Sequence, residues 1–440
     1  MGIDVDGRHH ESPHVVIVGG GFGGLYAARE LARYPVRVTL VDRHNYHLFQ
    51  PLLYQVATAT LSPGEIAEPI RAILRKHRNV RVLLAEATSV DLANRRVVLA
   101  DGELRYDYLI LAPGAGHSYF GHEEWAPLAP GLKSLEDALE IRRRIFFAFE
   151  AAEREEDPAA RRAWLNFIIV GGGPTGVELA GAIAEIRRHT VAHDFRAIDP
   201  RQARIVLVEA GPRVLAAYPP DLSESAERAL RALGVEVRTN TLVTDVTPDS
   251  VRVGEEVLPT RTALWAAGVA ASPLGRSLGA PLDRSGHVPV EPDLTLPGHP
   301  EVYVIGDLAA LTDQAGKPLP GLAAVAIQQG QAAAENVWRT IRGQPRRPFR
   351  YVDRGTMATI GRGAAVAELG RLHLSGPLAW VVWLAVHIYW LIGFENRLLV
   401  LLQWAWSYLT FARGARLITG PFGPRFNVLP KAKAQARRRE

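Results

Sequence analysis

The chain has 440 residues, 48% of them hydrophobic and 22% charged, which is ordinary for a globular protein of about three domains. It contains no cysteine, so disulfides, thiolate zinc sites, cysteine-held iron–sulfur clusters and thiol catalysis are excluded. The formal net charge is +5, an excess that suits nucleic acid, an anionic membrane or acidic cofactors equally well.

In chain order, residues 1–13 form a polar stretch without an apolar run, and we expect a disordered lead and no secretory signal. From His14 the pattern becomes strand, glycine loop, helix and strand. His14–Val18 is a β-branched run, an Ala/Leu-rich helical pattern continues to Arg33, and Val36–Val41 is the next expected strand.

The loop between the first strand and the helix carries Gly19, Gly21, Gly23 and Gly24 and fits G-x-G-x-x-G. In this motif the first glycine permits the turn, the second lets the backbone approach a pyrophosphate, and the third packs helix against strand. Asp42 ends the next strand, where a carboxylate can accept hydrogen bonds from a ribose. The sequence predicts a dinucleotide site here rather than a merely structural turn.

The same pattern returns later in the chain, which predicts two copies of one nucleotide-binding architecture. A strand is expected at Trp164–Val170, a helix at Val177–Arg188 and a strand at Ile205–Val208. The second loop consists of Gly171, Gly172, Gly173, Pro174, Thr175 and Gly176. Its acid, Glu209, follows later than the roughly 20 residues that are usual, because His189–Arg204 resembles an insertion.

A carboxylate at Glu209 favours the free 2′-hydroxyl of NADH over the 2′-phosphate of NADPH, although Arg213 lies nearby in the sequence. Two dinucleotide sites in one chain point to electron transfer. One dinucleotide is a hydride carrier that comes and goes, and the other can be a flavin that stays bound.

The remaining segments show weaker patterns of secondary structure. Ser89–Ile110 alternates like antiparallel strands with a turn at Asp101-Gly102, and residues 151–162 are expected to form a surface helix. Val302–Ile305 is an expected strand that runs into Gly306-Asp307. Residues 375–394 and 398–412 contain no Asp, Glu, Lys or Arg, and a basic tail, Lys431–Arg439, follows.

The order of these motifs resembles the pyridine nucleotide–disulfide oxidoreductase superfamily, in which an NAD domain interrupts an FAD domain. Tyr106–Gly114 looks like the chain's exit from the FAD domain, Ala263–Gly268 like the end of the NAD domain, and Val302–Asp307 like the segment whose aspartate reaches the flavin's ribityl chain. The resemblance implies an α/β fold with two Rossmann-like dinucleotide-binding domains and a C-terminal helical membrane-attachment region. The expected division is 1–13 lead, 14–120 FAD-binding domain (first part), 121–163 connecting helical segment, 164–290 NADH-binding domain, 291–350 FAD-binding domain (second part) and 351–440 membrane-associated region.

The absence of cysteine excludes the thiol-dependent members of this superfamily, because disulfide reductases and sulfide:quinone reductases work through thiols. The chain is similar instead to the type II NADH dehydrogenases, single-subunit NADH:quinone reductases of respiratory electron transport that do not pump protons. The segment around Phe49, Pro51 and Tyr54 resembles the part of that family that lines the flavin ring. Leu322–Gly330 resembles the quinone motif A-Q-x-A-x-Q, with Gln328 at its second glutamine and Ala324 in place of the first.

The resemblance implies hydride transfer from NADH to FAD, followed by two-electron reduction of a membrane quinone, with no metal. Glu178, on the first turn of the second helix, is the candidate residue against the nicotinamide, although an acid that only stabilises the helix N-terminus is the plainer alternative. Gln328 is the candidate for the quinone pocket, and His47 is a weaker candidate for proton delivery. The other expected cofactor-binding residues are Pro51, Gly114, Gly268, Gly306 and Asp307.

His387–Arg397 and Trp404–Leu409 resemble the family's membrane-attachment region. The second uncharged run is too short to span a bilayer as a helix. Asn396, Gln403, Ser407 and Thr410 fall in one polar helical sector opposite leucines and tryptophans, which is an interfacial pattern. We expect monotopic attachment through residues 376–412 and the basic tail, on the cytoplasmic face of the cell membrane, rather than a span.

Two other functions fit the same architecture, a soluble NADH-dependent ferredoxin or rubredoxin reductase and a redox-sensing flavoprotein similar to apoptosis-inducing factors. The apolar helices could instead be buried in a homodimer, which can coexist with membrane attachment, and nucleic-acid binding is not expected.

Overall fold

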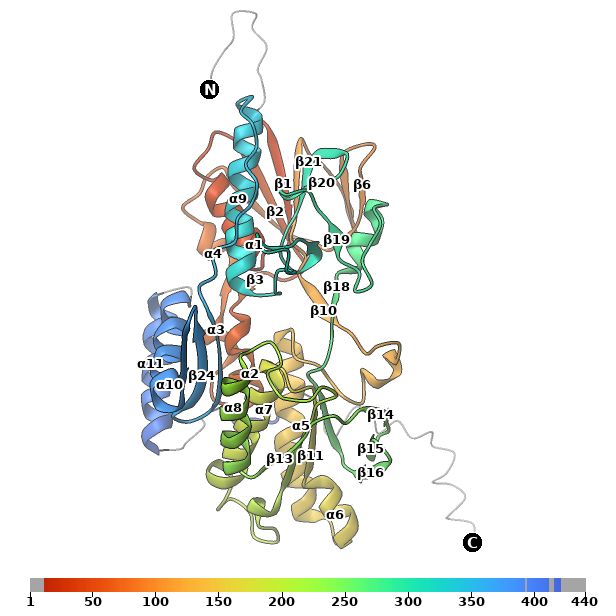
Figure 1. The fold of residues 1–440 in the computed structure, drawn as a ribbon, viewed down its shortest axis with the longest axis vertical. Helices are drawn as coiled ribbons and strands as arrows, with labels where there is room; N and C mark the ends of the chain where they lie inside the picture. Colours follow the sequence, from red (N-terminus) through yellow and green to blue (C-terminus); the bar gives the residue numbers. More distant parts are fainter. Residues whose placement is uncertain (1–11, 392–393, 411–414, 421–440) are drawn as a thin grey trace, which may run out of the picture. The chain divides into compact units, whose positions relative to one another are not determined.

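The computed structural model describes residues 12–391, 394–410 and 415–420. Most of the expected lead and the basic tail Lys431–Arg439 lie outside these residues. The chain divides into two compact units (Figure 1). The first comprises Met1–Leu48, Ala67–Gly116 and Val269–Arg354, and the second comprises Phe49–Ile66, His117–Gly268 and Gly355–Glu440.

The first unit is built on a six-stranded sheet in the order β20-β21-β9-β1-β2-β5. All neighbours in it are parallel except β20 and β21. Its strands are β1 (His14–Val18), β2 (Arg37–Asp42), β5 (Val80–Leu84), β9 (Tyr108–Leu111), β20 (Thr295–Leu296) and β21 (His299–Val304). The predicted strands at His14–Val18 and Val36–Val41 are thus confirmed within one residue.

A three-stranded antiparallel meander joins β5 to β9 and consists of β6 (Ala87–Asp91), β7 (Arg96–Leu99) and β8 (Gly102–Arg105). Its last turn falls at Ala100-Asp101, one residue before the predicted turn. The antiparallel prediction was wrong for β9, because this strand pairs in parallel with β1 in the main sheet. Alternating hydrophobicity does not distinguish these two partners.

Helices α1 (Phe22–Leu31) and α9 (Ala323–Ile341) pack side by side in the first unit (Figure 1). A side chain at Gly330 would place its Cβ 2.2 Å from the carbonyl oxygen of Gly23, so two glycines permit this close approach. The smaller elements of the unit are β3 (Tyr46–Leu48), β4 (Ala67–Pro69), α4 (Ile70–Leu74), β10 (Ala115–His117), β18 (Val269–Ala271), η5 (Pro273–Leu278), β19 (Val288–Pro289), η6 (Gly306–Leu308) and β22 (Ala309–Ala310).

The second unit repeats the plan of the first, which confirms the predicted duplication. Its parallel sheet has the order β13-β12-β11-β17, and an antiparallel meander again precedes the last strand. The strands are β11 (Asn166–Val170), β12 (Arg204–Val208), β13 (Val235–Arg238), β14 (Val243–Val246), β15 (Ser250–Val253), β16 (Glu256–Pro259) and β17 (Thr262–Trp265). Two Rossmann-like sheets of this kind confirm the predicted fold class.

The helices of this sheet are α5 (Leu135–Arg154), α6 (Pro158–Trp164), α7 (Pro174–Glu185) and α8 (Pro220–Ala232). Asp157 interrupts the expected helix at 151–162 and caps α6, its side chain accepting hydrogen bonds from the backbone N–H groups of Ala159 and Ala160. The prediction that the strand begins at Trp164 was wrong, because Trp164 ends α6 and β11 begins at Asn166. The helix expected to continue to Arg188 changes at Ile186 to a π-helical turn, Ile186–Thr190; η2 (Glu123–Trp125) and η4 (Pro200–Gln202) are short 3₁₀ turns.

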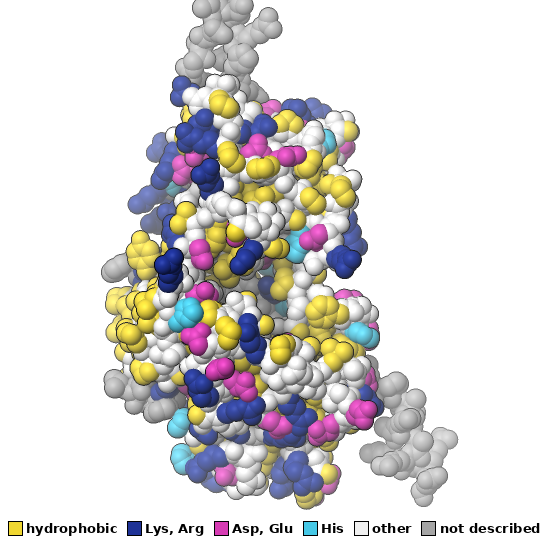
Figure 2. All heavy atoms as spheres, viewed as in Figure 1, with side chains coloured by type: hydrophobic (Ala, Val, Ile, Leu, Met, Phe, Trp, Pro, Cys, Tyr) yellow, Lys and Arg dark blue, Asp and Glu magenta, His cyan; other side chains and the backbone are white. Residues whose placement is uncertain are grey.

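The rest of the second unit comprises η1 (Gln50–Leu52), α2 (Leu53–Ala57), α3 (Pro63–Ile66), a three-stranded antiparallel sheet, and two apolar helices, α10 (Gly376–Trp390) and α11 (Phe394–Thr410). The sheet consists of β23 (Thr356–Gly361), β24 (Ala364–Leu369) and β25 (Leu372–Ser375) and was not predicted. Hydrophobic side chains gather over α10 and α11 (Figure 2). Among the described residues, none of the helices combines the length and apolar character needed to cross a bilayer.

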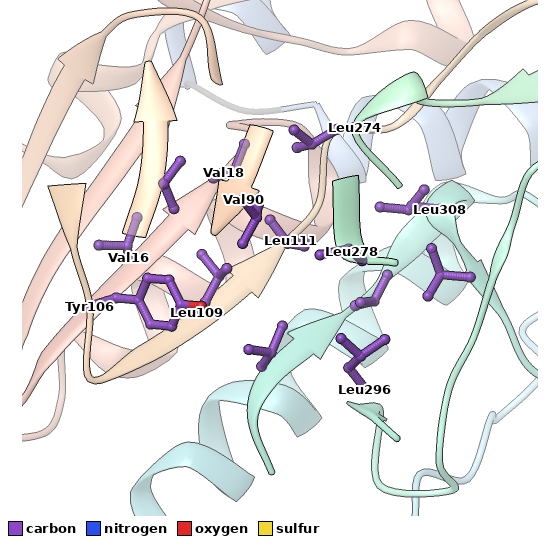
Figure 3. Close-up of a cluster of buried hydrophobic side chains, with 14 of the residues drawn as sticks. Val16, Val18, Val90, Tyr106, Leu109, Leu111, Leu274, Leu278, Leu296 and Leu308 are labelled. Atoms are coloured by element: carbon purple, nitrogen blue, oxygen red, sulfur yellow. The ribbon is translucent and has the colours of Figure 1, made fainter. Parts of the chain in front are cut away.

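The core of the first unit lies between the parallel sheet, the meander and the segments that follow β18 (Figure 3). Val16, Leu109 and Leu111 from the sheet meet Val90 from the meander and Leu308 from η6. The carboxyl ends of β1 and β21 are thereby held together beside the first glycine loop.

Candidate functional site

The first glycine loop requires glycine at its two ends. Gly19 has φ of +100°, and a Cβ there would lie 2.1 Å from the carbonyl oxygen of Ala112. A Cβ on Gly24 would lie 1.8 Å from the carbonyl oxygen of Gly19. At Gly21, by contrast, no described atom lies within 4 Å of an added Cβ, so the loop is open where the motif expects a pyrophosphate to approach.

The second loop has the same geometry. Gly171 has φ of +106°, and a Cβ on Gly176 would again lie 1.8 Å from the carbonyl oxygen at the start of the loop. No described atom lies within 4 Å of a Cβ added to Gly173. Pro174 and Thr175 open α7, with its N-terminus at the loop. Both loops therefore fit a dinucleotide phosphate, each in its own unit.

Each predicted acid binds the backbone of its loop. The Asp42 carboxylate accepts hydrogen bonds from the N–H groups of Gly20 (2.6 Å) and His44 (2.7 Å). The Glu209 carboxylate accepts them from Gly172 (2.6 Å) and Gly211 (2.7 Å). Because each carboxylate oxygen has a second lone pair, these side chains can hold the loop and still accept a ribose hydroxyl.

The predicted Gly306-Asp307 turn forms η6 directly after β21. Gly306 has φ of +68°, and its N–H donates to Oε1 of Gln329 at 2.6 Å. Gln329 is buried and was missed by the sequence analysis, because its neighbour Gln328 carried the motif match. A Cβ on Gly321 would lie 3.3 Å from Oδ1 of Asp307, so a glycine leaves room for that carboxylate.

Gln328 lies on α9 but is engaged with the main chain of Val352. Its Nε2 donates to the Val352 carbonyl and its Oε1 accepts from the Val352 N–H, each at 3.0 Å. His47 is buried, and its Nδ1 lies 3.0 Å from the carbonyl oxygen of Gly20, which makes Nδ1–H the donor. Since burial lowers the pKa of His47, the ring is neutral and supports the first loop.

The remaining predicted cofactor residues lie in turns. Gly114 follows β9 with φ of +73°, and Gly268 follows β17 with φ of +85°. A Cβ on Gly268 would lie 2.7 Å from Cζ of Phe120. Pro51 lies in η1 of the second unit, ahead of α2.

The second unit also contains a pocket that is lined by Glu178 and three tryptophans, among other residues. Three of its walls are α7, β23 with the turn that follows, and α2 with Thr60. The indoles of α10 and α11 form the fourth. Gly181 allows this arrangement, because a Cβ there would lie 1.7 Å from the carbonyl oxygen of Ile360. The residues that line the pocket are Tyr54, Gln55, Thr60, Glu178, Ala182, Glu185, Thr359, Ile360, Gly361, Arg362, Trp380, Trp383 and Trp404.

The polar groups of the pocket include several hydrogen-bond donors. Burial raises the pKa of Glu178 well above its usual range, and a hydrogen bond that its carboxylate accepts from the Thr359 backbone opposes this shift, so burial favours the protonated carboxyl. The indole N–H of Trp383 is buried, with no hydrogen-bond partner among the described residues. Trp404 donates from Nε1 to Oε1 of Gln55 at 2.7 Å. The lining thus combines aromatic side chains, hydrogen-bond donors and the charged side chains of Arg362 and Glu185 around a cavity of about 50 Å³, a chemistry suited to an apolar group that bears acceptor oxygens.

Comparison with known proteins agrees with two nucleotide folds in one chain. The sequence model described as "Pyridine nucleotide-disulphide oxidoreductase" matches residues 13–330, and that of the "NDH2 C-terminal domain" matches residues 354–413. The fold and the paired loops thus define a flavin-dependent pyridine nucleotide oxidoreductase.

Individual relatives indicate which group of enzymes within this class the chain is similar to. The type II NADH:quinone oxidoreductase Ndh of Mycobacterium tuberculosis is 46% identical over 421 residues, covering 92% of this chain and 90% of that protein. NdhA of the same organism, also a type II NADH:quinone oxidoreductase, is 45% identical over 433 residues, covering 94% and 90%. The structure of NDH2 from Plasmodium falciparum in complex with NADH has a TM-score of 0.85 at 22% identity, covers 93% of this chain and 100% of its own, and shares the fold.

The chain belongs to the pyridine nucleotide-disulphide oxidoreductases and, within them, to the type II NADH:quinone oxidoreductases. It is accordingly an oxidoreductase whose cofactors are FAD and NADH.

Proposed function

We propose that this chain passes a hydride from NADH to FAD and then two electrons to a membrane quinone, without pumping protons, with the first loop holding FAD and the second NADH. Two loops of matching geometry, each tied to an acid, carry this proposal. Bound FAD supplies the redox chemistry, and the chain binds, orients and shields the reactants.

We assign FAD to the first loop and NADH to the second because of the residues that surround each loop. Beside the first loop, Gly306 and Asp307 offer a second anchor, which suits the larger cofactor that stays bound. Beside the second loop, Glu209 faces the position of a ribose and disfavours a 2′-phosphate, which suits NADH. In this account Asp307 binds the ribityl chain of FAD, and the turns at Gly114, Gly268 and Pro51 border the cofactors.

We place the quinone head group in the tryptophan pocket of the second unit. Quinone reduction consumes two protons, and we propose that the carboxyl of Glu178, expected from the sequence to lie against the nicotinamide, donates one of them to a carbonyl oxygen, since burial favours its protonated form. Trp383 offers an unused N–H to the same ligand. Gln328, the residue first expected at the quinone, would have to release the Val352 main chain before its amide could take part.

The apolar surface of α10 and α11 is proposed as the membrane attachment (Figure 2). Its most exposed side chains are Leu378, Val381, Tyr389, Leu398, Leu402 and Trp406, each between 49% and 70% exposed. A contiguous surface of this kind on helices that do not span a bilayer favours monotopic contact with lipid. We propose attachment at the cytoplasmic face, where NADH is available, with a homodimer through this surface as the competing use.

The quinone assignment is tested by obstructing the pocket. Ala182 is buried on the pocket wall, and Ala182→Phe should abolish reduction of a short-chain quinone by NADH. Each quinone rate is divided by the rate with ferricyanide, which takes electrons without a shaped pocket and so reports FAD loading and NADH binding. Ala159→Phe, at an exposed position on α6, is the matched control. Normal quinone reduction by the Ala182→Phe protein would reject the pocket.

Membrane attachment is tested by placing negative charges on the proposed membrane surface. Leu402→Glu with Trp406→Glu should release the protein from vesicles that contain anionic lipid, whereas Leu242→Glu, at an equally exposed leucine elsewhere in the second unit, should not. Unchanged vesicle binding, with a change from dimer to monomer instead, would assign the surface to a second copy of the chain. A soluble ferredoxin reductase would show neither change.

A further inference from the structure

A tight turn of the second unit holds a phenyl ring in solvent. The backbone N–H of His122 donates to the carbonyl oxygen of Tyr119 at 3.1 Å, and the two residues between them have positive φ, +54° at Phe120 and +92° at Gly121. These values match a type I′ turn, which favours asparagine or glycine at its first central position. Phe120 breaks this preference, and its side chain is 69% exposed.

Burial does not offset the strain of this backbone conformation. A phenylalanine in the left-handed region is an outlier. The other apolar residues with positive φ in the described part of the chain, Ala59, Leu215 and Leu294, are each at most 1% exposed. Phe120 combines the same strain with an exposed ring. Conflicts of this kind between sequence and backbone gather at functional sites.

Buried aromatic neighbours anchor the turn. Tyr119 stacks on Trp265 with ring centroids 5.1 Å apart, and the ring of Trp125 lies 5.7 Å from the same indole. Trp265 also donates from Nε1 to the carbonyl oxygen of Ser118 at 2.8 Å. All three of these aromatic side chains are buried. The backbone that carries Phe120 is therefore fixed on the end of β17.

The phenyl ring lies on one side of the second nucleotide loop, and Glu209 lies on the other. A Cβ added to Gly268, which follows β17, would lie 2.7 Å from Cζ of Phe120. A Cβ added to Gly171, at the start of the loop, would lie 2.6 Å from the carbonyl carbon of Ala266 in the same turn after β17. Glu209 follows β12, and β12 and β17 flank β11 in the sheet. Because the loop follows β11, it lies between the two side chains.

A dinucleotide bound at this loop has its halves on opposite sides of it. Open parallel sheets bind dinucleotides across the crevice where the strand order reverses, which here lies between β11 and β17. Glu209 is assigned to the ribose of the adenosine half, where NADPH carries its 2′-phosphate. The nicotinamide half therefore extends over the end of β17, toward Phe120.

We propose that the phenyl ring of Phe120 packs against the nicotinamide ring of NADH and sets how tightly this half of the nucleotide binds. This inference rests on the proposed assignment of NADH to the second loop. Two flat rings attract each other when they stack, and the ligand would cover the apolar surface that the turn exposes. Since the turn is anchored in advance, little ordering of the chain accompanies binding.

Two inhibitors separate the halves of the nucleotide. NAD⁺ carries the nicotinamide ring and ADP-ribose lacks it, and neither donates a hydride, so their inhibition constants against NADH, with ferricyanide as acceptor, report binding. Phe120→Ala should raise the constant for NAD⁺ and the KM for NADH roughly threefold to tenfold, the effect of one lost aromatic contact. The constant for ADP-ribose should not change. Phe120→Tyr, which keeps the ring, should behave as wild type.

The matched control is Val257→Ala. Val257 is an exposed apolar residue of the same unit, on β16, which leads into the amino end of β17 and not its carboxyl end. None of the three constants should change in this variant.

Stability distinguishes contact with the ligand from support of the turn. Phe120→Asn removes the ring but supplies the residue that a type I′ turn favours. The melting temperature of the FAD-loaded protein should therefore stay the same or rise, while the inhibition constant for NAD⁺ rises as in Phe120→Ala. A ring that only supports the turn would lower the melting temperature when it is replaced.

Three results would overturn the proposal: an equal rise of both inhibition constants in Phe120→Ala, an unchanged constant for NAD⁺, or a lower melting temperature in Phe120→Asn. Glu209→Gln tests the site beneath it and should raise both constants, because both inhibitors contain the adenosine ribose. If Glu209→Gln does so and Phe120→Ala changes neither, the nucleotide site stands and the Phe120 contact is rejected. If Glu209→Gln changes neither constant, the second loop does not bind NADH and both proposals fail.

Discussion

Glu209 offers a sharp test of which loop binds which nucleotide. Its carboxylate accepts backbone hydrogen bonds at both oxygens. In Glu209→Gln one oxygen becomes an NH₂ group, which cannot accept, so one of the two bonds must be lost. The neutral amide also weakens the hydrogen bond that the carboxylate is proposed to accept from the ribose. A hydrogen bond to a charged group contributes about 1.5–3 kcal/mol, which is about one to two orders of magnitude in affinity.

We therefore expect Glu209→Gln to raise the KM for NADH about tenfold or more and to reduce the preference for NADH over NADPH, because the repulsion of a 2′-phosphate is gone. The assay is steady-state oxidation of each nucleotide with ferricyanide, with the flavin content measured by absorbance. Asp42→Asn makes the equivalent change in the first loop and should lower the flavin content instead. FAD loss in the Glu209 variant, with an altered NADH KM in the Asp42 variant, would show that the loops are assigned the wrong way round.

Three further predictions follow from the same structure. Because the pKa of Glu178 is raised, kcat/KM for quinone should fall as the pH rises through that pKa, and a pH profile of Glu178→Gln should lack this step. Burial lowers the pKa of His387 from 6.5 to about 4, so the stability gained from a neutral ring is present above pH 6.5 and lost as the pH falls toward 4. Urea titrations should show a loss of up to about 3 kcal/mol that is absent in His387→Gln. Gly24→Ala should lower the melting temperature through its backbone clash, whereas Gly21→Ala should keep it and reduce FAD content; equal melting temperatures would contradict this.

The sequence predicted the nucleotide-binding parts well because their signals are local. Each loop, its preceding strand and its following helix occupy one short stretch of chain, and glycine is required at Gly19 and Gly171 by positive φ. Duplication of the pattern then predicted two Rossmann-like sheets. Ends of elements were less accurate, as at Trp164, because a helix and a strand meet there within two residues.

The pocket could not be predicted, because its walls come from distant parts of the chain. Trp404 and Gln55, which share a hydrogen bond, are 349 residues apart in the sequence. The sequence analysis grouped Trp404 with the interfacial aromatic residues, but Trp404 is buried, whereas Trp406 on the same helix is exposed. For Asn396, Ser407 and Thr410, the rest of the predicted polar sector, the side chains lie outside the described residues.

Gln328 shows the limit of motif matching. The motif drew attention to the start of α9, where the amide of Gln328 binds the Val352 main chain and Gln329 holds the Gly306 turn. Whether a motif residue faces a ligand or the backbone depends on the segment packed against it, which the motif does not contain.

The central claim is that electrons pass from NADH through FAD to a quinone. Stopped-flow absorbance of the purified FAD-loaded protein tests it most directly. We predict that one equivalent of NADH bleaches the flavin band and that a short-chain quinone restores it within the turnover time measured at steady state. A flavin that NADH reduces but that quinone does not reoxidise on that timescale would contradict the account.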